Sequence, residues 1–224
     1  MALKGLIFDL DGVLVDTVPA HYAAWHRMFV EYGYEFGPRK YREQVDGLRR
    51  FEGARAVMCD APTERVAEAA DLKNRYYREL IEQGQFNIFE CSVQFIRHCE
   101  QCGLRLAVAS SSGNVRYILQ KARILDAFTV VIGGDDVVNG KPDPEIFLAA
   151  AKGLSASVRE CVVFEDAVSG VLAAKRGGFY CVGVRDNDDS GDLALADEIV
   201  ATLGAINIER LQNRIDQLST PSSG

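Results

Sequence analysis

The stretch "FDLDGVLVDT", Phe8 to Thr17, contains the feature that decides the fold. An apolar, strand-like run at 6–8 ends abruptly at two aspartates, Asp9 and Asp11, and a glycine and a second apolar stretch follow. Two carboxylates held this close repel each other, and burying either one costs several kcal/mol unless something compensates. The pair therefore predicts a bound cation, or chemistry performed by the carboxylates, or both.

Composition and charge narrow the class of protein. The chain has 224 residues, of which 48% are hydrophobic and 25% charged, a balance typical of globular proteins. Its net charge of −7 argues against nucleic acid or an anionic membrane as a partner, since both reward a basic surface. There is no transmembrane-length apolar run or signal-peptide pattern, and the six cysteines show no disulfide framework. We expect a cytoplasmic monomer that binds a small molecule.

Five short apolar runs predict the strands of a parallel sheet. They lie at 3–8, 104–109, 128–134, 161–164 and 180–184, and helical patterns occupy most of the intervals. One of these, "DPEIFLAAAKG", has Asp143 as its expected N-cap and Pro144 at the first helical position. The alternation predicts an α/β fold with a doubly wound parallel sheet.

Residues 17–88 break this alternation, because they contain helical patterns and no comparable strand run. In the first pattern, Tyr22, Trp25 and Phe29 fall on one apolar stripe. We interpret 17–88 as an inserted helical cap domain with hinges at "DTVP" and "EQGQFNIFE". The α/β core domain is then discontinuous, at 1–16 and 89–218, and 219–224 is expected to be a disordered tail.

Polar side chains follow four of the predicted strands. They are Asp9 and Asp11, then Ser110 to Ser112, then Asp135, Asp136 and Lys141, and finally Glu165 and Asp166. Ligands of open α/β sheets bind at this carboxyl edge. Carboxylates suit Mg²⁺, and hydroxyls before a helix suit an anion, so together with a lysine they favour phosphoryl transfer. A carboxylate that attacks carbon, without a metal, is the alternative.

Four segments in this order, "DLDGVLVDT", "ASSS", "GKPDPEIF" and "FEDAVSG", resemble the motifs of the haloacid-dehalogenase superfamily. The two-aspartate form of the first resembles its phosphatases and phosphomutases, since carbon-attacking members have one aspartate there. The helical insert resembles the superfamily's cap. "HYAAW" (21–25) and "VDGLRR" (45–50) further resemble the β-phosphoglucomutase-like subfamily.

The resemblance implies a role for each matching residue. Asp9 would be the nucleophile that forms an aspartyl phosphate, and Asp11 the general acid and then base. Mg²⁺ would be held by Asp9, the backbone carbonyl of Asp11 and Asp166, with Glu165 bound to the metal or to its ligands. The residues implied in phosphate binding are Ser110, Ser111 through its N–H, Asn114, and Lys141, which would also balance charge at Asp9.

The cap residues bear on the substrate. His21, Trp25 and Arg50 match the subfamily and are candidates for substrate contacts and for coupling cap closure to Asp11. Two positions depart from it: β-phosphoglucomutases carry a lysine at the position of Asp46 and a serine at that of Arg49. The returning hinge, "NIFEC" (87–91), also lacks the usual proline-glycine pair.

Three function classes remain open. An acidic residue at 46 should repel a second phosphate, so we favour a Mg²⁺-dependent phosphatase of small phosphorylated metabolites, in particular sugar phosphates. A sugar phosphomutase and a non-catalytic ligand-binding relative are the alternatives.

Overall fold

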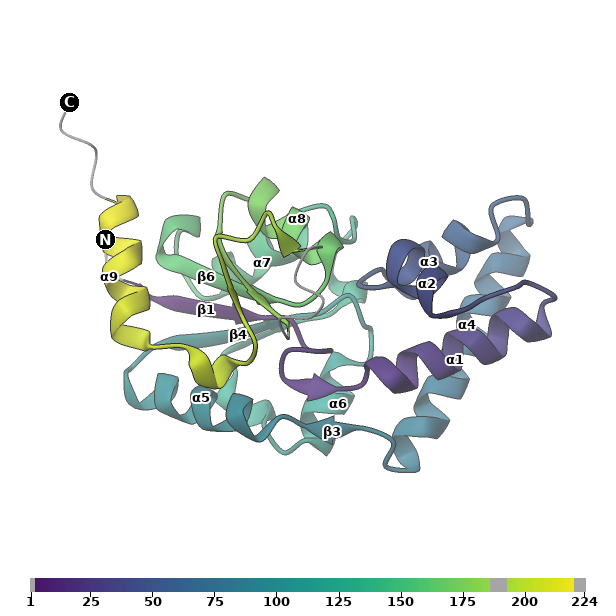
Figure 1. Ribbon diagram of the computed structural model, residues 1–224, viewed down its shortest axis with the longest axis horizontal. Coiled ribbons are helices and arrows are strands. Elements are labelled where there is room, and N and C mark those ends of the chain that lie inside the picture. Colours follow the sequence, from purple (N-terminus) through teal and green to yellow (C-terminus); the bar gives the residue numbers. More distant parts are fainter. Residues whose placement is uncertain (1–2, 186–192, 220–224) are drawn as a thin grey trace.

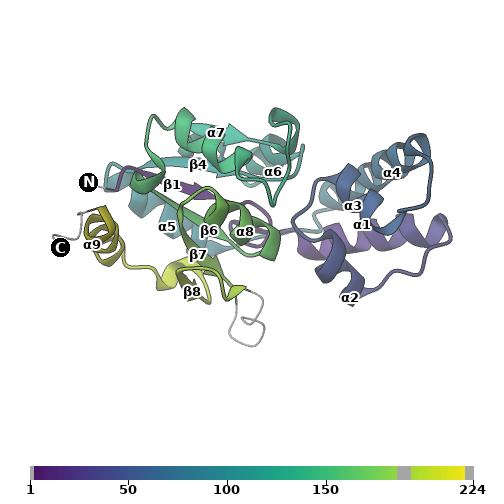
Figure 2. The same ribbon diagram turned by 90° about the horizontal axis from the view of Figure 1, so that it is seen from above.

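The computed structural model describes residues 3–185 and 193–219. An α/β core lies at one end of the molecule and a bundle of helices at the other (Figures 1 and 2). The core contains a six-stranded parallel sheet in the order β5-β4-β1-β6-β7-β8. Its strands are β1 (Gly5–Phe8), β4 (Arg105–Ala109), β5 (Val130–Ile132), β6 (Cys161–Glu165), β7 (Tyr180–Val184) and β8 (Glu198–Val200).

The predicted doubly wound α/β sheet is confirmed, and the five expected strands are present. The sixth, β8, was not predicted because its three residues carry no apolar run and are only half-buried. It extends the sheet by pairing with the edge of β7, from Val182↔Glu198 to Val184↔Val200. Its position depends on this pairing rather than on a local sequence pattern.

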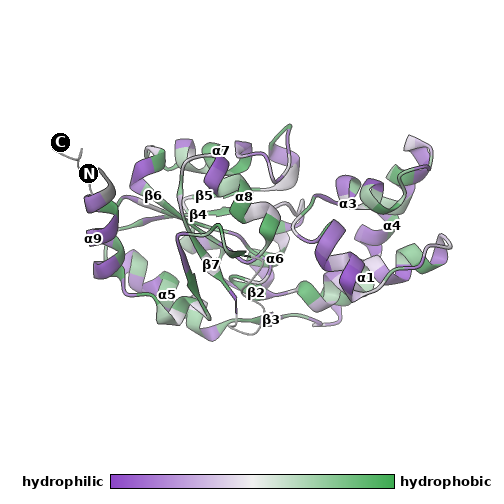
Figure 3. Ribbon diagram, turned by 45° about the horizontal axis from the view of Figure 1, so that its top comes forward, coloured by the Kyte–Doolittle hydropathy of each residue, from purple (hydrophilic) through white to green (hydrophobic). Residues whose placement is uncertain are grey.

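Helices cover both faces of the sheet. On one face lie α5 (Glu90–Gln101) and α6 (Val115–Lys121), and on the other α7 (Glu145–Gly153) and α8 (Val168–Arg176) (Figures 1 and 2). Side chains along β1 alternate between two hydrophobic clusters: Leu6 and Phe8 pack with Phe95 of α5, and Ile7 packs with Phe147 of α7. Hydrophobic residues accordingly follow the strands, while hydrophilic ones recur along the outer helices (Figure 3).

The remaining core elements are short, except for one helix near the C-terminus. Within the described residues they are the 3₁₀ turns Leu125–Ala127, Gly134–Asp136, Val158–Glu160 and Leu203–Ala205, and helix α9 (Ile208–Ser219). Helix α7 begins at Glu145, one residue later than the sequence predicts, and the Asp143 carboxylate accepts the Glu145 N–H at 2.9 Å, as a capping side chain does. Within the described residues no helix is long and apolar enough to cross a bilayer.

The helices of residues 17–88, which we refer to as the cap, pack mainly through α1 and α4. They are α1 (Val18–Glu31), α2 (Pro38–Lys40), α3 (Arg50–Val57) and α4 (Thr63–Glu82), with a π-helical turn at Tyr41–Val45. Trp25 and Phe29 are buried and stack at 5.4 Å between ring centroids, which accounts for the apolar stripe in α1.

The two connections between core and cap run side by side. Strand β2 (Val15–Asp16) pairs antiparallel with β3 (Asn87–Ile88), at the segments where the sequence predicts the hinges. The disordered tail expected at 219–224 lies, from residue 220 onward, outside the described residues.

Candidate active site

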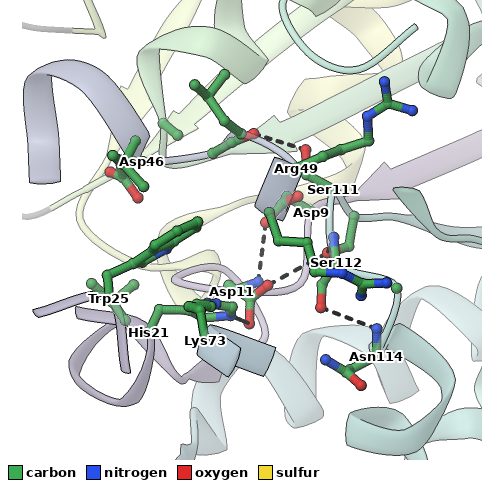
Figure 4. Close-up of a pocket in the computed structure, with 18 of the residues that line it drawn as sticks. Asp9, Asp11, His21, Trp25, Asp46, Arg49, Lys73, Ser111, Ser112 and Asn114 are labelled. Atoms are coloured by element: carbon green, nitrogen blue, oxygen red, sulfur yellow. Dashed lines mark hydrogen bonds and ion pairs between the residues drawn. The ribbon is translucent and has the colours of Figure 1, made fainter. Parts of the chain in front are cut away.

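The polar residues that follow the strands meet at the carboxyl edge of the sheet, beneath the cap. Asp9 and Asp11 follow β1, Ser110 follows β4, and Glu165 ends β6. Together with residues of the cap they enclose a cavity of about 80 Å³ (Figure 4). A single water needs about 10–15 Å³ of such volume, so the closed site has room for a small ligand or several waters.

Lys141 joins two buried carboxylates at the centre of the site. Its Nζ lies 2.5 Å from Asp9 Oδ1 and 2.5 Å from Glu165 Oε1, and all three side chains are nearly inaccessible to solvent. Burial raises the pKa of Asp9 to about 8 even though Lys141 lowers it, and the charges of Glu165 and Asp11 raise it further. One lysine therefore does not balance the negative charge around Asp9.

Asp11 accepts hydrogen bonds from both sides of the site. Thr17 Oγ1 donates to its Oδ1, and Ser110 Oγ donates to its Oδ2 at 3.4 Å. The backbone N–H of Asp11 donates to Asp9 Oδ2 at 3.0 Å, which orients the Asp9 carboxylate. Although burial alone would raise it, the pKa of Asp11 is below its ordinary value because of His21, Thr17 and Lys73.

His21 links Asp11 to a buried lysine of the cap. Lys73 Nζ lies 2.7 Å from His21 Nδ1, and His21 Nε2 lies 3.4 Å from Asp11 Oδ1 without a well-aligned hydrogen bond. Burial and the Lys73 charge lower the pKa of His21, which favours the neutral imidazole. When Lys73 is protonated its ammonium can only donate, so Nδ1 then accepts and the imidazole proton is on Nε2, facing Asp11.

Lys73 and Thr17 contact this centre but were not predicted as site residues. Lys73 lies among the aromatic rings of the cap, with Nζ 4.9 Å from the centre of the Trp25 ring, and burial lowers its pKa to about 7. A signal was present in the sequence: Val66, Ala69, Lys73 and Tyr77 fall on one helical stripe. A lysine on the buried stripe of an amphipathic helix indicates a pocket rather than a core.

The donors around Asp9 suit a hard cation. The Asp166 carboxylate lies against Gly12, where a Cβ would come within 1.9 Å of its Oδ2, so only glycine leaves room for it. Burial, together with the charges of Glu165, Asp46 and Asp9, raises the pKa of Asp166 well above its ordinary value. Oxygen donors that repel one another fit Mg²⁺ better than a softer ion.

Side chains alone do not form a ready-made metal cluster. No three His, Cys, Asp or Glu side chains are close enough for one among the residues that the structure describes. Glu165 uses one oxygen on Lys141 and accepts the Ala167 N–H on the other at 2.8 Å. The residues that would hold a cation here are Asp9, Asp166 and a backbone carbonyl, with waters as its other ligands, as is usual for Mg²⁺.

The serine-rich loop after β4 contacts the cap as well as the core. Ser110 is buried, and its Oγ accepts the Ser112 N–H at 3.1 Å. Ser111 Oγ donates to the Gly47 carbonyl at 2.7 Å. The Asn114 side chain, expected at the phosphate, lines the cavity and donates to Asn74 Oδ1 of α4 at 2.7 Å. In this closed arrangement Ser111 and Asn114 thus fasten the cap to the loop.

Two of the three charged residues of the cap segment 46–50, Asp46 and Arg50, line the cavity, and each has an opposite charge nearby. Arg50 Nη1 and the Asp135 carboxylate lie together beside Gly113. Asp46 lines the cavity, and burial raises its pKa although Tyr41 and Arg185 lower it. The cap therefore presents cations and carboxylates to the cavity side by side.

Comparison with known proteins places the chain in a family. The model of the haloacid dehalogenase-like hydrolases matches residues 3–178. The chain belongs to this family. It is 31% identical over 222 residues to the β-phosphoglucomutase of Bacillus subtilis (strain 168), covering 96% of each chain. It is 34% identical over 184 residues to a phosphorylated carbohydrates phosphatase of Thermotoga maritima, covering 79% of this chain and 82% of the relative.

A solved structure extends the similarity to the fold of both parts. The crystal structure of a β-phosphoglucomutase from Clostridium difficile superposes with a TM-score of 0.87 at 27% identity, covering 97% of this chain and 99% of that one. The resemblance inferred from the sequence is confirmed, and the protein is a phosphoryl-transfer enzyme.

Proposed function

We propose that the protein is a Mg²⁺-dependent phosphatase of small phosphorylated metabolites, sugar phosphates in particular, that acts through an aspartyl phosphate on Asp9. The observation that carries the proposal is the buried Asp9, whose Oδ1 is paired with Lys141 and whose Oδ2 accepts the Asp11 N–H. A carboxylate oriented by two donors beside an anion-binding loop is suited to attack phosphorus in line.

In the first step, an Asp9 oxygen forms a bond to phosphorus while the bond to the leaving oxygen breaks. Asp11 supplies the proton that the leaving oxygen takes up. Ser110, the N–H of Ser111 and Lys141 bind the phosphoryl oxygens and stabilise the charge that develops on them.

In the second step, water attacks the phosphorus of the aspartyl phosphate. Asp11 takes the proton from this water, the acyl phosphate bond breaks, and inorganic phosphate leaves with the Asp9 carboxylate restored. Asp11 enters this step as the carboxylate, because it gave up its proton to the leaving oxygen in the first step, and it can therefore act as the base.

The metal would be held by Asp9, Asp166 and the backbone carbonyl of Asp11. When bound, Mg²⁺ supplies positive charge that neutralises the phosphoryl group and keeps Asp9 ionised. This role is supported by the raised pKa of Asp9 and of Asp166 in the absence of a cation. Glu165 would act indirectly, by holding Lys141 in place.

Charges in the cap favour hydrolysis over a mutase reaction. A phosphomutase must hold a second phosphate of a bisphosphate at the cap side of the cavity. Here Asp46 lines that side of the cavity. The two arginines of the same segment already have carboxylate neighbours: Asp135 lies beside Arg50, and Glu52 is paired with Arg49. These carboxylates weaken any second phosphate site.

A phosphomutase is the second candidate, and a specific observation supports it. The His21–Lys73 chain reaches Asp11 from the cap, so cap closure can control when Asp11 transfers a proton and whether water enters. Some relatives of similar identity are named β-phosphoglucomutases and others phosphatases.

Two assays test the proposal. A panel of phosphorylated metabolites is incubated with the protein and Mg²⁺ while inorganic phosphate is measured, with Asp9→Asn as the inactive control. β-Glucose 1-phosphate with a trace of its bisphosphate is then followed by phosphorus NMR. We expect release of inorganic phosphate; glucose 6-phosphate that accumulates faster than inorganic phosphate would overturn the preference for hydrolysis.

A further inference from the structure

The side chain of Arg49 extends from the cap into the core. Its Nη1 donates to the carbonyls of Gly134 at 3.3 Å and Val137 at 3.1 Å, and its Nη2 donates to the carbonyl of Val138 at 3.0 Å. Glu52, one turn along α3, accepts from Nε at 2.8 Å and orients the guanidinium. The three carbonyls belong to the segment between β5 and Lys141, which is far from Arg49 in the sequence.

One glycine makes room for this side chain, and a second lies beside it. A Cβ at Gly140 would lie 2.8 Å from Arg49 Nε, whereas a Cβ at Gly134 would first meet the Ser111 carbonyl oxygen at 2.2 Å and would lie 3.2 Å from Arg49 Cδ. The three atoms nearest to the Gly140 position, Nε, Cγ and Cδ, all belong to Arg49. We refer to the carbonyls of Gly134, Val137 and Val138 together with Gly140 as the glycine socket.

Both ends of this contact adjoin the candidate active site. Gly140 immediately precedes Lys141, which is paired with Asp9. Arg49 immediately precedes Arg50, which lines the cavity. A displacement of Arg49 from the socket would therefore move Arg50 relative to the core.

On the opposite side of the cavity a different contact joins cap and core. Asn74 of α4 accepts from Asn114, and Arg78 of α4 lies over the ring of Tyr117 of α6 at 4.8 Å. The cap is thus fastened on its α4 side by Asn114 and α6, and on its α3 side by Arg49 together with the hydrogen bond from Ser111 Oγ to the Gly47 carbonyl. A hinge closed over a cavity needs such contacts on both sides, because one alone would let the cap rotate.

We propose that Arg49 is a positioning residue: it docks in the glycine socket when the cap closes, stabilises the closed form, and sets Arg50 against the cavity. The guanidinium fits because its two terminal nitrogens donate to three carbonyls while Nε donates to Glu52, four partners that exceed the three donors of an ammonium. The effect on closure stands by itself, while its effect on catalysis rests on the proposed phosphatase function.

The test compares four variants with the wild type. Arg49→Ala removes the side chain, and Gly140→Ala adds a methyl group that meets Arg49. The double variant combines both changes. Arg39→Ala is the matched control, because Arg39 is a cap arginine that is 87% exposed and pairs with Glu43 on its own surface. Small-angle X-ray scattering of each full chain, without metal or substrate, measures closure, and thermal melting checks that each variant is folded.

The proposed role of Arg49 predicts a specific pattern of radii of gyration. Arg49→Ala and Gly140→Ala should each increase the radius of gyration, the double variant should match Arg49→Ala, and Arg39→Ala should match the wild type. An unchanged radius in both single variants, or a double variant that opens further than Arg49→Ala, would overturn the proposal. If Arg49→Ala fails to fold, the radius of gyration of Gly140→Ala alone decides whether Arg49 holds the cap closed.

The kinetic readout separates positioning from catalysis. With the best substrate of the metabolite panel, Arg49→Ala should raise KM about tenfold, because only the closed fraction binds productively, while kcat changes little. A fall in kcat with an unchanged KM would contradict a positioning role. If no metabolite is hydrolysed, the proposed function fails, and the scattering result still decides whether Arg49 holds the cap.

Discussion

Replacing Lys141 by methionine should destabilise the fold far more than replacing a lysine in a comparable pair at the surface. Lys141 Nζ lies 2.5 Å from both the Asp9 and the Glu165 carboxylates, and the side chains of Lys141 and Glu165 are each 1% exposed. Removing one partner of a buried ion pair leaves uncompensated charge and costs about 3–5 kcal/mol. For a chain of this size, the melting temperature should fall by about 6–20 °C.

Lys175→Met is the matched control. Lys175 pairs with Asp197 at 2.5 Å, but the two side chains are 32% and 31% exposed. Because solvent screens the pair, its loss should cost at most about 1 kcal/mol. Urea denaturation followed by circular dichroism, with EDTA present, gives the free energy of unfolding of the wild type and both variants.

The loss of stability caused by Lys141→Met should become larger as pH rises. In the wild type the pKa of Asp9 is about 8, and Lys141 lowers it, so the variant has a still higher value. A carboxyl whose folded pKa exceeds its unfolded value of 3.8 contributes stability that is lost as pH rises through the folded pKa. The loss of stability with rising pH ends near pH 8 in the wild type but continues to higher pH in the variant. The difference in free energy of unfolding between wild type and Lys141→Met should therefore be larger at pH 9 than at pH 6. Equal losses for the two lysine variants, or a difference that shrinks as pH rises, would refute this reasoning.

Three further predictions concern activity. Asp9→Asn should lower turnover by at least about a thousandfold without lowering the melting temperature, and near-normal turnover of the purified variant would remove Asp9 as the nucleophile. EDTA should abolish activity and Mg²⁺ restore it, while Asp166→Ala should raise the Mg²⁺ concentration required; full activity in metal-free buffer would rule this out. Lys73, with a pKa of about 7, loses its charge as pH rises through that value, so kcat/KM of the wild type should fall above pH 7. Lys73→Met should reduce kcat/KM about tenfold or more, and its kcat/KM should no longer fall above pH 7. A variant whose kcat/KM has the same pH dependence as the wild type would show that Lys73 is not the titrating group.

The residues at the strand ends were predictable because topology and local pattern agree. Each apolar run identifies a strand, and parallel strands necessarily bring their carboxyl ends to one edge. Asp9, Ser110 and Glu165 therefore come together although more than 150 residues separate the first from the last. The same argument accounts for Asp11, which follows the first strand.

The cap side of the site was less predictable because it depends on how two bodies meet. Lys73 reaches His21 only because α4 packs against α1, which no local pattern specifies. Asn114 was expected at a phosphate, and its bond to Asn74 of the cap could not be read from the sequence. Arg49 was noted as a departure from the subfamily, and only the structure brings it to Gly140.

The measurement that tests the central claim most directly is chemical trapping of the intermediate. The protein, Mg²⁺ and a substrate labelled in its phosphoryl group are mixed, quenched in acid within the first turnover, and digested at low pH for peptide mapping. We expect labelled phosphate on a peptide that contains Asp9, released by hydroxylamine as an acyl phosphate should be, and none in Asp9→Asn. Turnover without protein-bound phosphate, or phosphate on a peptide that lacks Asp9, would contradict the account.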